Sequence, residues 1–101
     1  MVKIHIHPGD AAGRGLLQQY LKRRRGELAQ LREALAAANF EQIRRVGHNL
    51  LGSGAAYDLP RISMLGERLE RAAEGANGTE IAAIVADLED FLDAVVLGPA
   101  P

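Results

Sequence analysis

The segment FEQIRRVGHNLLGSGAAYDLP, residues 40–60, decides the fold because it has the pattern of a one-sided helix. Its bulky apolar residues gather on one side of the projected helix: Ile43, Val46, Leu50 and Tyr57. Asn39 precedes the segment, and Gln42 lies three positions later, which is the spacing of a capping box. We therefore predict a helix that begins after Asn39, runs to about Tyr57 and buries one face.

Helical periodicity continues on the N-terminal side, over residues 11–38. Leu16, Leu17 and Tyr20 form one apolar stripe, and Leu28 and Leu31 belong to a second. The stripe changes phase across the basic run at residues 22–26. This change predicts a bend or break there, and thus a short extra helix before the first long one.

Two further helices follow residues 40–57. Asp58 is the expected N-cap of the third helix, with Pro60 in its first turn. Thr79 is the expected cap of the last one, which Gly98 and Pro99 should end. The apolar residues of the last helix have heptad-like spacing: Ile81, Ile84, Val85, Leu88, Phe91, Leu92 and Val95. Short loops between such helices predict an all-α, antiparallel up-and-down four-helix bundle over residues 11–97.

Residues 1–10 have a different pattern, in which apolar residues alternate with Lys or His before Pro8 and Gly9. Period-two alternation is typical of extended chain. With no second strand apparent, we expect an extended N-terminal arm laid on the bundle. Its His5 and His7 have a spacing that can chelate a metal, but no third ligand is evident, so we expect no metal site.

Composition excludes several classes of protein. The net charge is −1, without the basic excess of a dedicated nucleic-acid binder. The chain has no Cys, which excludes disulfides, thiolate nucleophiles and Cys-based metal sites. Apolar runs stay shorter than the roughly 20 residues that span a bilayer. We expect a cytoplasmic domain that binds neither nucleic acid nor membrane.

One side chain of the central helix stands out, since the apolar seam must face the core and His48 lies opposite it. Gly52 and Gly54 weaken the helix and leave space around the ring for a partner. With a reference pKa of about 6.5, an exposed imidazole is largely neutral near pH 7 and nucleophilic. An inert surface histidine is the simpler alternative. Arg44 and Arg45 lie on the same face and favour a phosphoryl acceptor, since they could neutralise a bound anion.

The stretch from His48 to Pro60, with Ile62, Leu65 and the pair Leu69-Glu70 after it, resembles the histidine-containing phosphotransfer (HPt) domain. That family has His-x-Leu-Lys-Gly-Ser, then small residues and a downstream Leu-Glu. The resemblance covers roughly residues 16 to 96. It implies a phosphorelay intermediate in which His48 accepts a phosphoryl group from a receiver-domain aspartyl phosphate and passes it to another receiver.

Further expectations follow from the resemblance. The partners would be receiver domains of response regulators and a hybrid histidine kinase, with the chain itself a monomer. It would be a phosphocarrier without ATPase or kinase activity and without a cofactor, since Mg²⁺ belongs to the receiver. Phosphoryl transfer needs mainly positioning and charge neutralisation, which the partner's active site supplies.

The sequence departs from the family pattern at Leu51, where a Lys is usual. Arg44 or Arg45 could replace that cation, or Leu51 could be an apolar docking contact. A second function therefore stays open, an interaction module that regulates a kinase or receiver without being phosphorylated. The residues expected to dock the partner or neutralise the phosphoryl group are Arg44, Arg45, Leu51, Gly52 and Ala55.

Overall fold

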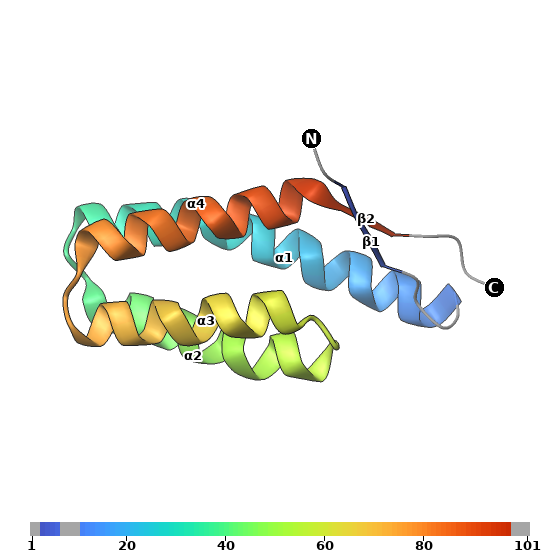
Figure 1. Cartoon of the computed structure of the whole chain (residues 1–101), viewed down its shortest axis with the longest axis horizontal. Coiled ribbons are helices and arrows are strands. Elements are labelled where there is room, and N and C mark those ends of the chain that lie inside the picture. Colours follow the sequence, from blue (N-terminus) through green and yellow to red (C-terminus); the bar gives the residue numbers. More distant parts are fainter. Residues whose placement is uncertain (1–2, 7–10, 98–101) are drawn as a thin grey trace.

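The computed structural model describes residues 3–6 and 11–97 (Figure 1). The four helices are α1 (Ala11–Ala36), α2 (Phe40–Ala56), α3 (Pro60–Glu74) and α4 (Gly78–Ala94). Residues 37–39, 57–59 and 75–77 link them, so consecutive helices run antiparallel. Helix α1 contacts α2 and α4, and α3 contacts the same two helices. This arrangement confirms the predicted all-α up-and-down four-helix bundle.

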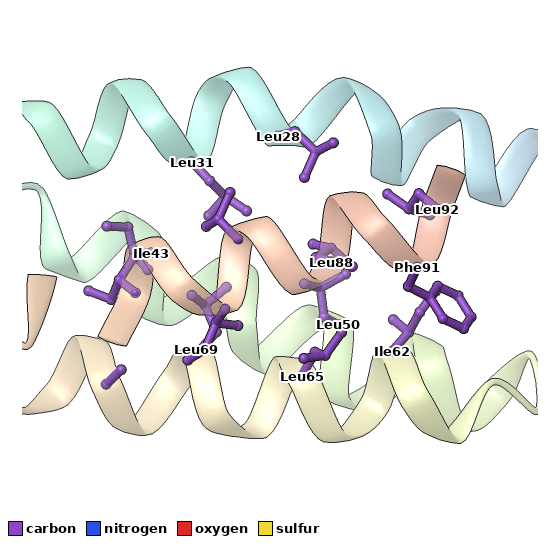
Figure 2. Close-up of a cluster of buried hydrophobic side chains, with 14 of the residues drawn as sticks. Leu28, Leu31, Ile43, Leu50, Ile62, Leu65, Leu69, Leu88, Phe91 and Leu92 are labelled. Atoms are coloured by element: carbon purple, nitrogen blue, oxygen red, sulfur yellow. The ribbon is translucent and has the colours of Figure 1, made fainter. Parts of the chain in front are cut away.

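All four helices contribute to the core (Figure 2). The largest fully buried side chains are aliphatic: Leu31, Ile43, Leu50, Ile62, Leu65, Leu69, Ile81, Ile84 and Leu88. Among the described residues, no polar or charged one is buried by the same measure. The fully buried part of the bundle is therefore aliphatic.

The expected break in the first helix is wrong, and so is the short extra helix, because α1 is continuous from Ala11 to Ala36. Arg24 carries the buried stripe across the basic run between Tyr20 and Leu28. Its side chain is 13% exposed, its guanidinium lies 4.8 Å from the centre of the Tyr20 ring, and it pairs with Glu27 at 2.8 Å. A long Arg stem can cover apolar surface in this way.

The helix caps follow the prediction in part. Asn39 does cap α2, since its side chain accepts a hydrogen bond from the Gln42 N–H. Asp58 does not cap α3, because its φ of 56° places it in the left-handed region, and Leu59 takes the N-cap position without a side-chain hydrogen bond. Asn77, rather than Thr79, caps α4.

The N-terminal arm is paired, contrary to the expectation of an arm without a second strand. Strand β1 (Ile4–Ile6) runs parallel to strand β2 (Val95–Leu97), which directly follows α4. The prediction that the last helix includes Val95 and runs to Gly98 is therefore wrong, because α4 ends at Ala94 and the β-branched Val95 and Val96 continue the chain as a strand. Pro8, Gly9, Gly98 and Pro99, expected to end these elements, lie outside the described residues.

Helices α2 and α3 approach closely at three glycines. A Cβ on Gly47 would lie 2.6 Å from the backbone nitrogen of Glu70, and one on Gly66 would lie 2.5 Å from that of Leu51. A Cβ on Gly54 would likewise clash with the backbone of Ser63. No larger residue fits at these positions without a shift of one helix. The glycines therefore fix the separation of α2 and α3.

Candidate functional site

His48 lies in the middle of α2, and the structure places it on the outside of the bundle. Its side chain is 67% exposed. On the opposite side of the helix, Ile43 and Leu50 are almost completely buried. The core thus fixes the rotation of α2, and this rotation turns the imidazole toward solvent, as the apolar seam predicted.

One ring nitrogen of His48 has a partner on the neighbouring helix. Nδ1 lies 3.2 Å from Oε2 of Glu70 in α3. An ionised carboxylate can only accept a hydrogen bond, so Nδ1 must donate one. In the neutral imidazole this leaves Nε2 without a proton and with a free lone pair. The contact therefore selects the tautomer in which Nε2 is the nucleophile.

Glu70 is held in this position by its surroundings in α3. It follows Leu69, which is fully buried, and its own backbone nitrogen packs against Gly47, the residue before His48. Its side chain is only 17% exposed. Glu70 had no predicted role beyond its place in the Leu69-Glu70 motif, because its contact with His48 depends on how α2 and α3 are aligned.

The two arginines predicted for this face differ in their surroundings. Arg44 donates two hydrogen bonds to Glu41, at 2.8 and 2.9 Å, and its Nη1 lies 3.6 Å from Oε2 of Glu70. The Arg44 hydrogen bond lowers the pKa of Glu41, and the same hydrogen bond raises the pKa of Arg44. Arg45 is 69% exposed, with one longer contact, 3.8 Å from Glu41. Arg44 is thus already engaged by carboxylates, whereas Arg45 extends toward solvent.

The other predicted contact residues extend along the same face. Gly52 is exposed, and a Cβ built on it would meet nothing within 4 Å. Leu51 is half-buried, and its carbonyl accepts a hydrogen bond from Ser63. The expectation that Gly54 also clears this face is wrong, since Gly54 is buried against α3. Only Gly52, of these two glycines, leaves open space near His48.

A shallow hollow of about 310 Å³ lies two helical turns from His48, beginning at the exposed Ala55. Its lining is mainly apolar or small and includes two acidic side chains: Ala55, Asp58, Leu59, Pro60, Ser63, Met64 and Glu67. Met64 is 43% exposed there. The hollow and the imidazole therefore belong to one accessible surface formed by α2 and α3.

Helix α1 contacts the C-terminal end of α2 through aromatic and hydroxyl groups. The hydroxyls of Tyr20 and Ser53 lie 2.7 Å apart, and the rings of Tyr20 and Tyr57 stack with their centres 4.2 Å apart. Ser53 thus faces α1 and does not join His48 in a hydrolase-like arrangement. Tyr57 ends the apolar seam at the bundle's edge, where it is still 36% exposed.

Metal sites and membrane spans are two further features that the described part of the chain lacks. Over residues 3–6 and 11–97, no cluster of three or more His, Cys, Asp or Glu side chains is arranged to hold a metal ion. His7, half of the His-x-His pair, lies outside these residues. Within the same part of the chain, no helix has the length and apolar character needed to cross a membrane.

An antiparallel four-helix bundle with an exposed histidine in the middle of its second helix is the arrangement that the resemblance to HPt domains predicted. The comparison with family models agrees, because the Hpt domain model matches residues 15–97. The chain belongs to the Hpt domain family. Comparisons with curated proteins and with solved structures find no significant match. Hpt domains are phosphocarriers rather than enzymes, and they act with receiver domains and histidine kinases in two-component signalling.

Proposed function

We propose that His48 is the phosphoryl acceptor and that its Nε2 carries the group between two receiver domains. The observation that carries this proposal is the hydrogen bond between Nδ1 and Glu70 on an otherwise exposed ring. It leaves Nε2 free to attack, while solvent exposure leaves the ring accessible to a docked partner. Arg45, Leu51, Gly52 and Ala55 form the surface that such a partner would cover.

The transfer step follows from this arrangement. The Nε2 lone pair of His48 attacks the phosphorus of a receiver's aspartyl phosphate. The bond between phosphorus and the aspartate oxygen breaks, and the aspartate leaves as a carboxylate. The phosphorylated ring keeps its Nδ1 proton and is cationic, so the Glu70 carboxylate stabilises it. In the second transfer, the aspartate of another receiver attacks phosphorus and the bond to Nε2 breaks.

We assign Mg²⁺ to the receiver and no cofactor to this chain. The receiver's cation would neutralise the phosphoryl oxygens during transfer, which lessens the need for a lysine at position 51. Arg45 is the cation of this chain best suited to assist, since it lies one turn before His48 and extends into solvent. Arg44 is less available because two carboxylates hold it.

The direct test mixes the chain with a phosphorylated receiver and Mg²⁺, for wild type and for His48→Gln. Acid-labile label on the wild type alone supports phosphotransfer through His48. Label on His48→Gln as well would exclude His48 as the acceptor.

The alternative is a module that regulates a receiver or kinase without accepting phosphate. Leu51, where the family usually has lysine, favours it, because no lysine then lies beside the ring. Firm binding of the receiver, with no label on the wild type or on His48→Gln, would support this alternative.

A further inference from the structure

Three charged side chains, Glu41, Arg44 and Glu70, lie in contact one after another and lead to the imidazole of His48. Glu41 binds Arg44 through both carboxylate oxygens, and Arg44 lies 3.6 Å from Glu70. The same Glu70 oxygen, Oε2, accepts the hydrogen bond from Nδ1 of His48. The series therefore runs from an acid through a base to an acid and ends on the imidazole.

Arg44 lies on the wrong side of His48 to hold a phosphoryl group. It contacts the oxygen that also binds Nδ1, whereas the phosphoryl group would be on Nε2, the other ring nitrogen. Its bidentate pairing with Glu41 further restrains it. Glu74, one turn beyond Glu70, adds a further negative charge that acts on Arg44. The charged groups around Arg44 thus hold it on the Nδ1 side.

A half-buried carboxylate needs a cation or several hydrogen-bond donors to satisfy its oxygens and hold them in position. Arg44 supplies the cation for Glu70, and Gly47 supplies the space that brings the α3 backbone close. Without Arg44, Glu70 would lose its neighbouring positive charge and one of the two groups that orient its carboxylate.

Building on the proposed function, we propose that Arg44 is a positioning residue that acts through Glu70. It keeps the Glu70 carboxylate directed at Nδ1, and so keeps the His48 proton on Nδ1 and the lone pair on Nε2. This role differs from the phosphoryl-neutralising role that the sequence suggested for Arg44. It makes the nucleophilic form of His48 depend on a residue that touches neither the phosphoryl group nor the ring.

The test compares Arg44→Gln, Arg44→Lys and Arg71→Gln with wild type. Arg71 is the matched control, because it is an exposed arginine on α3 whose partner is Glu67. Long-range ¹H–¹⁵N spectra report which ring nitrogen carries the proton, and the His48→Gln spectrum identifies the His48 signals. Phosphorylation is measured from a phosphorylated receiver and from phosphoramidate, where Nε2 attacks phosphorus and ammonia leaves.

We expect Arg44→Gln to lower the fraction of the Nδ1–H tautomer and to slow phosphorylation about two- to fivefold from both donors. Arg44→Lys should restore part of the tautomer fraction and part of the phosphorylation rate, and Arg71→Gln should match wild type in both measurements. An unchanged tautomer ratio in Arg44→Gln would overturn the proposal. Slower phosphorylation from the receiver but not from phosphoramidate would also overturn it and would make Arg44 a docking contact.

Failure of the proposed function gives a separate result. A wild-type chain that takes phosphate from neither donor would refute phosphotransfer through His48. The tautomer spectra would still decide whether Arg44 acts on the ring.

Discussion

Gly47 and Glu70 lie so close that a side chain on Gly47 would overlap the backbone of Glu70. This contact brings α3 against α2 at the residue before His48, and it places the Glu70 carboxylate beside the ring. A packing contact between two helices thus positions the carboxylate that hydrogen-bonds to an exposed ring.

Glu70→Gln should leave the fold intact and slow phosphoryl transfer to His48 about tenfold, the effect of losing a charge-assisted hydrogen bond. A neutral amide can donate or accept, so it no longer selects the Nδ1–H tautomer. Transfer from a phosphorylated receiver measures the rate. Glu89→Gln is the control, since Glu89 pairs with Arg32 on α1. An unchanged rate in Glu70→Gln would show that the hydrogen bond does not matter for transfer.

Gly47→Ala and Gly52→Ala form a matched pair on one helix. The first should lower the free energy of unfolding by about 1–3 kcal/mol, because α3 must move to admit the methyl group. The second should raise the free energy of unfolding by up to about 1 kcal/mol, since its methyl enters open space and alanine favours helix. Urea denaturation measures both. Equal effects from the two substitutions would contradict the described packing.

Leu51→Lys restores the cation that the family pattern has three residues after the histidine. We expect a folded protein whose transfer rate is unchanged or up to about fivefold higher, because an exposed ion pair contributes modestly. Circular dichroism checks the fold, and label transfer measures the rate. A large drop in a folded variant would mean instead that Leu51 is an apolar contact that the receiver requires.

Glu41 gives stability a dependence on pH. The Arg44 hydrogen bond lowers its pKa in the folded chain, so the stabilisation is present above the ordinary carboxylate value and disappears as pH falls through the lowered one. The difference in free energy of unfolding between wild type and Glu41→Gln should therefore shrink between about pH 6 and pH 3. Urea titrations across that range measure it. A difference independent of pH would argue against the Glu41–Arg44 pair.

Local pattern was sufficient to predict α2 and the exposure of His48. The seam of Ile43 and Leu50 fixes the rotation of the helix, and the cap at Asn39 fixes its start. Each of these depends on residues within a few positions of one another, which a helical projection describes.

Features that depend on contacts between distant segments were not predictable in the same way. Arg24 lies in the basic run at which a bend or break was predicted, and only its packing on Tyr20 shows how the buried stripe continues there. The pairing of Glu70 with His48 requires the alignment of α2 and α3, and the β1–β2 pairing requires both ends of the bundle. Asp58 resembles a cap by composition, but its left-handed backbone belongs to the preceding turn.

The interlocked glycines give the bundle unequal tolerance to substitution. Every side chain proposed to take part in the chemistry belongs to the hairpin of α2 and α3, whose spacing leaves no room for even one extra carbon at Gly47, Gly54 or Gly66. Helices α1 and α4 contribute mostly aliphatic side chains to the core, and no glycine of α1 or α4 would place a Cβ in a clash with the backbone of another helix, among the glycines described. Homologous chains should therefore vary more in the sequences of their first and last helices than in the central hairpin, where a larger residue at Gly47, Gly54 or Gly66 would clash with the facing helix.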